Sequence, residues 1–507
     1  MTGEKGTQSP VPRSQFQEEE MAKEKEEPRE VSRREFVKGA AVGAAGVAAA
    51  GVLASCAPAA TPTTAPAATA TPVVCPECPP CPTPGVPEKW DKEADVVVVG
   101  TGGGGLSAAI MAHDAGAKVL VLQKMASVEA CDTALSGGAA NSWSSKYDFQ
   151  TKLGIEDSAD LHYEDTRKGG DYTNDPDLVR KLVDEAPDII NWLGDLGLEY
   201  TGELGWLGGA SVPRAHTTVS GSGIDMIQAL KKAAEDRAIE ILLETKAVKL
   251  VVDKGRVIGI KAVRAEKEQF FKAKRAIVMA TGGFGLNPEM VRCHDPRFEE
   301  SPSTNLEGTT TGEGILMCQE IGAGVHGMAY IQCFPACDPE TGSIVTPALL
   351  STKLGPGILV NVEGLRFVEE KERRDVRRDA ILLQTGGFCF GIFDDEQLKE
   401  HIEKKRVFYK QIPDVLEKSI ERGIAFKTDT VEELAEKAGI HAAKRAETVH
   451  KWNSYVDAGD DPDFHRRDIK AITLIEKPPF YAYKTCPSIH HTCGGLWIKT
   501  EAQVLGA

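Results

Sequence analysis

The sequence predicts an α/β fold built around a parallel β-sheet. Residues 95–99 form a short, almost entirely β-branched run that leads through a glycine-rich turn into a helix-like segment, 106–112. A second apolar run, 118–122, follows at the spacing of a strand–helix–strand unit. The length of 507 residues exceeds that of one small domain and suits two or more globular units.

Composition and charge narrow the classes of partner. The chain has a net charge of −16, so it lacks the basic footprint that nucleic-acid binding requires. No run of about 18 strongly apolar residues is present, so we expect no transmembrane helix. The 50 glycines and 28 prolines indicate a turn-rich fold with at least one unfolded stretch.

Residues 1–55 have the pattern of an export signal. Arg33 and Arg34 precede Phe36 and Lys38, and a weakly apolar Gly/Ala/Val stretch follows, which is typical of a twin-arginine signal. The segment 53–56 ends in Cys56 and resembles a bacterial lipobox, in which the cysteine is lipidated. The alternatives are a short amphipathic or buried helix and an ordinary thiol at Cys56. We therefore expect an extracytoplasmic protein, exported folded and anchored to the membrane through Cys56.

Residues 56–92 are predicted to form a proline-rich tether. Prolines among Ala and Thr favour extended polyproline II conformation and cannot bury a core. Cys75, Cys78 and Cys81 have metal-like spacing, but three thiols make an incomplete site. No histidine follows Cys78 or Cys81, so the haem-attachment pattern is absent. A disulfide, a structural role or no chemistry is favoured over a metal for these cysteines.

The glycine-rich turn has the pattern of a dinucleotide-binding site. The motif G-x-G-x-x-G is matched at Gly100, Gly102 and Gly105, between the predicted strand and helix. Such glycines permit a tight turn and a close approach of the backbone to a pyrophosphate at the helix N-terminus. Gln123 stands where the ribose-binding acidic residue is expected, and an amide can still hydrogen-bond a hydroxyl. The alternative is a glycine-rich loop without a ligand.

Further predicted strands lie at 239–253, 256–263 and 275–280, with a turn at Lys254 and Gly255. The last strand ends in Ala280, Thr281 and two glycines, which is typical of FAD folds. Residues 93–507 resemble the FAD-dependent flavoprotein family of fumarate reductase and succinate dehydrogenase, especially flavocytochrome fumarate reductases and urocanate reductase-like proteins. The motifs that carry the resemblance are 100–105, 133–138, 280–285, 311–314, 358–361 with 364–367, 374–375 and 490–495.

This resemblance implies a Rossmann-like FAD-binding domain interrupted by an α+β capping domain. The first part of the FAD domain would span 93–324, the cap 325–475, and an incomplete return of the FAD domain 476–507. The implied cofactor is FAD. The implied cofactor-binding residues are Gly100, Gly102, Gly103, Gly105, Gln123, Lys124, Thr133, Ser136, Gly137, Gly138, Val248, Ala280, Thr281, Gly282 and Gly283.

The resemblance also implies the catalytic residues. In the family, hydride passes between flavin N5 and one carbon of an activated C=C bond, while a proton is transferred at the neighbouring carbon. Arg374 would be the proton donor, although a free guanidinium is a very poor acid. His490 would bind a substrate carboxylate or carbonyl, and His491 would lie nearer the flavin. The alternatives are a solvated charge for Arg374 and a core or metal role for the histidines; we expect no metal.

The chain departs from the fumarate reductase pattern in three places. Phe334 replaces a second carboxylate-binding histidine, and Leu349, Leu350 and Lys353 replace a Thr-Glu pair and a relay arginine. An apolar residue there would leave one charge of a dicarboxylate buried and unpaired. The sequence also stops before the Gly-Glu and Asn-Arg segments of the family, which favours a C-terminally truncated fragment.

The resulting function is an exported, FAD-dependent reductase of an enoate-type substrate other than fumarate, suited to anaerobic respiration. The expected substrate has a single carboxylate or carbonyl and a bulky or aromatic tail. The electron donor is left open. Two alternatives remain: a dehydrogenase acting on a ketosteroid-like ring, and a non-catalytic flavin-binding lipoprotein or inactive fragment.

Overall fold

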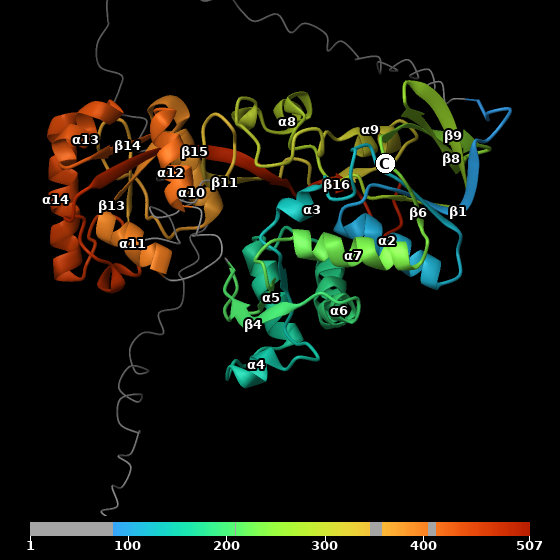
Figure 1. Ribbon diagram of the computed structural model, residues 1–507, viewed down its shortest axis with the longest axis horizontal. Helices are drawn as coiled ribbons and strands as arrows, with labels where there is room; N and C mark the ends of the chain where they lie inside the picture. The colour runs from blue at the N-terminus through green and yellow to red at the C-terminus, as the bar shows by residue number, and fades with distance from the viewer. Residues whose placement is uncertain (1–84, 208, 345–356, 404–411) are drawn as a thin grey trace, which may run out of the picture. The chain divides into compact units, whose positions relative to one another are not determined.

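The computed structural model describes residues 85–207, 209–344, 357–403 and 412–507 (Figure 1). The expected export signal, Cys56 and the tether cysteines Cys75, Cys78 and Cys81 lie outside the described residues, as do Leu349, Leu350 and Lys353. In the part of the chain that the structure describes, no helix has the length and hydropathy needed to cross a bilayer.

The main sheet has the strand order β6-β2-β1-β9-β8-β7. Its strands are β1 (Lys92–Val99), β2 (Val119–Leu122), β6 (Glu240–Leu242), β7 (Thr245–Asp253), β8 (Arg256–Arg264) and β9 (Lys267–Met279). The strands β6, β2, β1 and β9 are parallel, whereas β8 and β7 continue the sheet as antiparallel strands. The α/β prediction is confirmed.

The expectation of one continuous strand over 239–253 is wrong. The chain turns at Glu244, whose φ of 51° lies in the left-handed region, and this turn separates β6 from β7. The two strands pair with different neighbours, β6 with β2 and β7 with β8. The predicted turn at Lys254 and Gly255 is confirmed, because both residues have positive φ.

Helices cover both faces of this sheet, which explains why residues 96–99 of β1 and all of β2 are apolar. On one face, α2 (Gly103–Asp114) and α7 (Ile224–Asp236) pack on β1 and β2 through a core that includes Leu106, Ile110 and Leu230. On the other face, α9 (Glu313–Gln319) contributes Met317 and Cys318 to a second core.

Between β2 and β6 the chain forms a mixed segment. It contains α3 (Asp132–Leu135), β3 (Ala139–Asn141), α4 (Phe149–Lys152), α5 (Ala159–Gly169), α6 (Pro176–Asp195), β4 (Tyr200–Gly205) and β5 (Ala215–Thr218). The three strands form a sheet in the order β3-β5-β4. The fully buried Arg214 is paired with Asp157 and Asp165 at 2.9 and 2.7 Å, which satisfies its charge.

The residues after α9 form a second sheet with the order β11-β15-β13-β12, and β14 also pairs with β15. Its strands are β11 (Ile331–Cys337), β12 (Ile358–Val360), β13 (Cys389–Asp394), β14 (Ala425–Thr428) and β15 (Phe480–Thr492). The helices of this region are α10 (Arg374–Leu382), α11 (Asp395–Glu403), α12 (Ile412–Glu421), α13 (Val431–Ala438) and α14 (Ala442–Ala458). Cores around Phe393 and Trp452 lie beside this sheet.

Strand β15 lies in the stretch 476–507 of the sequence, but it pairs with strands of the stretch 325–475. Its first half pairs with β13 and β14, and its second half pairs with β11 (Figure 1). After β15 in the chain, β16 (Gly495–Leu496) pairs with β10 (Val325–His326). Helix α8 (Pro288–His294) lies between β9 and α9 in the sequence. Short 3-10 turns complete the described elements at Pro296–Phe298, Thr385–Gly387 and Ile469–Ala471. One strand therefore runs from the α+β region to residues near the main sheet.

Candidate functional site

The turn between β1 and α2 requires glycine for steric reasons. Gly100 has a φ of 106°, and a Cβ there would lie 2.3 Å from the Ala280 carbonyl oxygen. A Cβ at Gly105 would lie 2.1 Å from the Gly100 carbonyl oxygen. Around Gly104, by contrast, a Cβ would meet no atom within 4 Å. The outer glycines let helix and strands approach, and the backbone at Gly104 borders open space.

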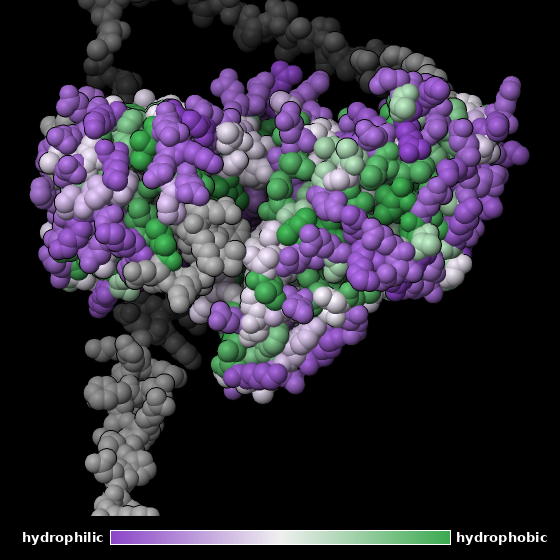
Figure 2. Space-filling model, in the orientation of Figure 1, coloured by the Kyte–Doolittle hydropathy of each residue, from purple (hydrophilic) through white to green (hydrophobic). Residues whose placement is uncertain are grey.

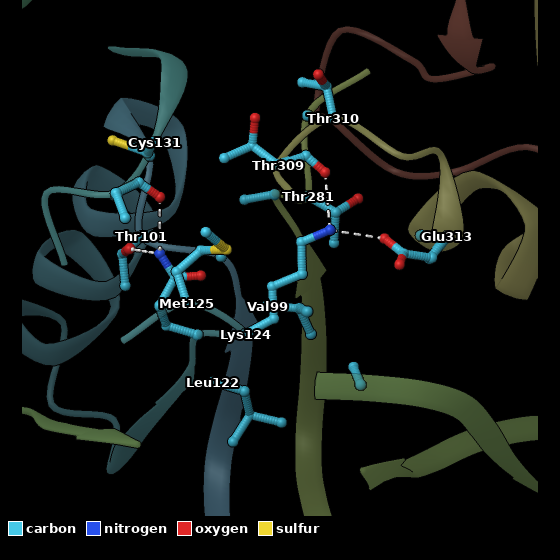
Figure 3. A pocket seen from close by; sticks show the side chains of 18 of the residues that line it. Val99, Thr101, Leu122, Lys124, Met125, Cys131, Thr281, Thr309, Thr310 and Glu313 are labelled. Atoms are coloured by element: carbon cyan, nitrogen blue, oxygen red, sulfur yellow. Dashed lines mark hydrogen bonds and ion pairs between the residues drawn. The ribbon is translucent and has the colours of Figure 1, made fainter. Parts of the chain in front are cut away.

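That open space is a cavity of about 350 Å³ at the carboxyl ends of the parallel strands (Figure 3). Such a position is where open α/β sheets bind their ligands. The predicted residues that line it are Gly100, Gly102, Gly103, Gln123, Lys124, Thr133, Ala280, Thr281 and Gly282. Thr133 also accepts a hydrogen bond from the Gly103 N–H, at 3.1 Å, which fixes the first turn of α2.

Gln123 is buried at the floor of this cavity with its amide group oriented. Its Nε2 donates to the Thr101 hydroxyl at 2.5 Å and faces the Ala130 carbonyl oxygen at 3.5 Å. No described residue donates to its Oε1, and Gln123 belongs to the cavity lining. The carbonyl oxygen is therefore the atom left to accept a hydrogen bond from a ligand hydroxyl.

Lys124 reaches across the cavity to Glu313 (Figure 3). Its Nζ lies 2.9 Å from Glu313 Oε2 and 2.7 Å from the Thr309 carbonyl oxygen. Lys246 Nζ lies 2.9 Å from Glu313 Oε1. Burial alone would raise the pKa of Glu313, but hydrogen bonds from Lys124, Thr311 and Lys246 outweigh it and lower the pKa to about 2. The carboxylate is charged at neutral pH and holds both lysines at the cavity.

The sequence reasoning missed the roles of Glu313 and Lys246 in this lining. The 311–314 motif signalled the position of Glu313, whereas nothing local marks Lys246. On the surface between α9 and α2, hydrophobic side chains gather within a hydrophilic border (Figure 2).

Other predicted cofactor residues lie outside the lining of this cavity. Val248 follows the lining residues 245–247 on β7. Gly138 has a φ of 60° and packs against Ser222 and Thr218, so it shapes the turn after α3. Ser136 donates to the Thr133 carbonyl oxygen at 2.8 Å and is exposed, as is Gly137. These residues stay predictions as cofactor contacts.

The candidate catalytic residues come together where α10, β11 and β15 meet. Arg374 is the first residue of α10, and its guanidinium lies 4.7 Å from the Phe334 ring centroid. Its Nη1 donates to Gln332 Oε1 at 3.2 Å, so its polar partner here is uncharged. Burial lowers the pKa of the Arg374 guanidinium from its ordinary value.

His490 lies beside the same aromatic ring. Its imidazole meets Phe334 edge to face with centroids 5.6 Å apart, and the His491 ring is 4.0 Å away. Its Nδ1 shares a 2.7 Å hydrogen bond with the Thr304 hydroxyl, which fixes the ring orientation. Burial, and then the charges of His491 and Arg374, lower the pKa of His490 to about 3. His490 is therefore neutral at physiological pH.

The two halves of the site meet at Gly283. A Cβ on Gly283 would lie 2.0 Å from Thr492 Oγ1, and the same oxygen accepts from the Phe284 N–H at 3.1 Å. The glycine turn after β9 thus touches β15 directly after the paired histidines. Asp132, at the start of α3, binds the nearby Leu306 N–H at 2.8 Å. No local pattern marks Thr304, Gln332 or Asp132, because their partners lie far away along the chain.

Among the described residues, no group of three or more His, Cys, Asp or Glu side chains could hold a metal ion. The site does fit a dinucleotide. The fit rests on open space at Gly104, a helix N-terminus at Gly103 and the available oxygen of Gln123. Bound FAD would be held by these groups and by the Lys124 and Glu313 pair.

Comparisons with known proteins agree with this geometry. Residues 95–507 match the family described as FAD binding domain. The chain is 39% identical over 435 residues to urocanate reductase of Eggerthella lenta, covering 83% of this chain and 68% of that protein. It is 36% identical over 416 residues to a fumarate reductase (cytochrome) of Shewanella frigidimarina, covering 82% and 69%.

A solved structure described as the open conformation of a flavocytochrome c3 fumarate reductase matches with a TM-score of 0.70 at 34% identity. The match covers 82% of this chain and 71% of that one. The family match, the cavity and the glycine turn all indicate the same cofactor, which is FAD. The chain belongs to the FAD-dependent flavoprotein family of fumarate reductase and succinate dehydrogenase, whose members are oxidoreductases acting on CH–CH bonds.

Proposed function

We propose that this protein uses FAD to reduce an activated C=C bond whose substrate carries one carboxylate or carbonyl group. The observation that carries the proposal is the cluster of Arg374, Phe334 and His490. His490 belongs to β15, whose last residue, Thr492, touches the Gly283 turn. In this proposal Arg374 is the proton donor and His490 is the polarising group. Relatives named urocanate reductase and fumarate reductase support the same reaction class.

When bound and reduced, FAD would supply the hydride equivalent. As the hydride reaches one alkene carbon, negative charge develops on the adjacent carbon and on the attached carbonyl or carboxylate oxygen. The neutral His490, oriented by Thr304, donates a hydrogen bond to that oxygen. Arg374 transfers a proton to the adjacent carbon, so that one hydride and one proton saturate the bond.

Phe334 sets the substrate class that we propose. Its ring contacts both the Arg374 guanidinium and the His490 imidazole, and it offers no hydrogen bond to a second carboxylate. It does offer a surface on which an aromatic or bulky tail can pack. Urocanate, an imidazolyl acrylate with one carboxylate, has this character, and aryl or alkyl enoates are therefore the proposed substrates.

The test is turnover by the purified holoprotein with a reduced viologen dye as electron donor. The panel contains urocanate, cinnamate, acrylate, crotonate and fumarate. At least one monocarboxylate should be reduced well and fumarate poorly, whereas fumarate turnover rivalling the best of the panel would refute the substrate class. Arg374→Met should abolish alkene reduction with FAD still bound.

The matched control is Arg373→Met. Arg373 is half-exposed and pairs with Asp171 and Asp375, so its loss should leave turnover largely intact. Unchanged turnover in Arg374→Met would remove Arg374 from the mechanism.

We also propose export by the twin-arginine route and lipid anchoring at Cys56. The support is the sequence of residues 1–56. Replacing Arg33 and Arg34 by lysine should retain the protein in the cytoplasm, and Cys56→Ala should release it from the membrane fraction. An unchanged distribution in either variant would overturn the corresponding half of this proposal.

A further inference from the structure

A second arginine of α10, Arg377, is buried and forms no ion pair with any residue that the structure describes. Only 4% of its surface is exposed, and among the described residues its Nε and Nη1 have no hydrogen-bond partner. Burying an unpaired cation costs several kcal/mol, so proteins seldom retain one without a function. Arg377 lies three residues after Arg374, which places both side chains on neighbouring parts of one helix face.

The carboxylates nearest to Arg377 are engaged elsewhere. Glu370 accepts two hydrogen bonds from Arg366, from Nε and Nη2, each at 2.9 Å. Glu369 accepts from the Lys371 N–H at 3.0 Å and lies 3.4 Å from Arg467. The thiol of Cys389 is fully buried, and burial raises its pKa, so it is neutral.

The next residue along the helix shows the contrast. Arg378 donates to both oxygens of Asp379, at 2.8 and 3.0 Å, and to the Ile331 carbonyl oxygen at 3.2 Å. Among the described residues, the same helix thus pairs the partly buried Arg378 with a carboxylate and leaves the buried Arg377 without one.

The groups that face Arg374 do not neutralise its charge either. From β11 they are Gln332, Phe334 and Cys337, and burial raises the pKa of the Cys337 thiol so that it is uncharged. From β15 they are His490, which is neutral, and His491. Two guanidinium groups therefore share one low-dielectric region without a carboxylate partner among these neighbours.

We infer that Arg377 is a positioning residue whose uncompensated charge makes Arg374 a stronger acid. Like charges in a desolvated region disfavour each other's protonated form. Burial and then the charge of Arg374 lower the pKa of Arg377 to about 10. The reciprocal effect on Arg374 favours release of its proton to the substrate carbon, and each pKa unit so gained is tenfold in the proton-transfer equilibrium. This inference rests on the proposed function.

The experiment compares Arg377→Met and Arg377→Gln with Arg378→Met as the matched control on the same helix. Because both Arg377 variants remove an unpaired buried charge, their Tm should equal or exceed that of the wild-type holoprotein. Their kcat for the best enoate should fall at least tenfold, with KM within threefold and FAD content unchanged. The solvent deuterium isotope effect on kcat should increase, because proton delivery becomes slower. Arg378→Met should lower Tm and leave the isotope effect unchanged.

A lower Tm for both Arg377 variants, or wild-type kcat and isotope effect, would overturn the inference. A readout independent of turnover is the rate at which phenylglyoxal modifies Arg374, followed by mass spectrometry. That reagent attacks the deprotonated guanidine, so modification should be slower in both Arg377 variants. If the wild-type holoprotein reduces no alkene of the panel, the proposed function fails, and the phenylglyoxal rates still decide whether Arg377 acidifies Arg374.

Discussion

Replacing Gly105 by alanine tests whether the FAD turn is built as the structure indicates. Alanine is the better helix former, by up to about 1 kcal/mol, so propensity alone predicts a gain in stability. Sterically, the new Cβ would lie 2.1 Å from the Gly100 carbonyl oxygen and 3.3 Å from the Ala280 Cβ. Relieving the first contact requires α2 to move away from β1 by about 1 Å, which is overpacking between rigid backbones.

The residues that this movement would disturb are well packed. Leu106, Ala109 and Ile110 of α2 are all 0% exposed and belong to the core beneath the sheet. Overpacking of this kind costs about 1–3 kcal/mol or more, so the steric penalty outweighs the propensity gain. We expect a net loss of about 1–2 kcal/mol and a marked fall in FAD affinity.

The control is Gly104→Ala, where a Cβ would meet no atom within 4 Å. Urea unfolding of the apoprotein measures the free energy of unfolding, and flavin fluorescence titration measures FAD affinity. We expect Gly104→Ala to match or exceed wild-type apoprotein stability. Equal stability of the two variants would refute the close approach of α2 and the Gly100 carbonyl.

Three further results are expected. Because the pKa of Glu313 is lowered to about 2, its charge stabilises the fold above pH about 4.5, and this stabilisation is lost as pH falls towards 2. Glu313→Gln should therefore flatten the acid side of the curve of unfolding free energy against pH. An unchanged curve would show that the ion pairs of Glu313 with Lys124 and Lys246 do not stabilise the fold. Arg366→Met should lower the free energy of unfolding, measured in urea, by about 3–5 kcal/mol, because the fully buried carboxylates of Glu370 and Asp461 lose their ion pairs with Arg366. Phe334→His should raise the turnover of fumarate relative to that of cinnamate. An unchanged ratio of the two turnover rates would show that Phe334 does not determine substrate choice.

The strands that flank the FAD turn could be predicted because their cause is local. A β-branched run between residues 95 and 99 followed by glycines leaves few alternatives to a buried strand and a tight turn. The break at Glu244 could not be predicted, because it depends on two strands that pair with different neighbours. The partners of Lys246 and His490 depend on tertiary contacts of the same kind.

The charged run 371–378 shows most clearly what could not be predicted from the sequence. On sequence alone it has the composition of a solvated surface, and only resemblance singles out Arg374. In the structure Arg373 is exposed and paired, and Arg378 is paired with its neighbour Asp379. Arg377 is buried, and its Nε and Nη1 have no partner in the described part of the chain. Which arginine enters the interior depends on the face of α10 that packs on the sheet, and composition carries no information about that face.

The unpaired cations raise the question of why the proposed site should prefer one substrate carboxylate to two. A second negative charge would gain from the distant charge of Arg377, and two unit charges about 8 Å apart attract by about 2 kcal/mol at an effective dielectric constant of about 20. Arg377 is buried, with only 4% of its surface exposed, so the balance includes its charge but no hydrogen bond from it to that carboxylate. The group near Arg374 and His490 that would face it instead is the Phe334 ring. Desolvating a carboxylate without hydrogen bonds costs several kcal/mol, which exceeds the gain, so the balance favours a monoanion.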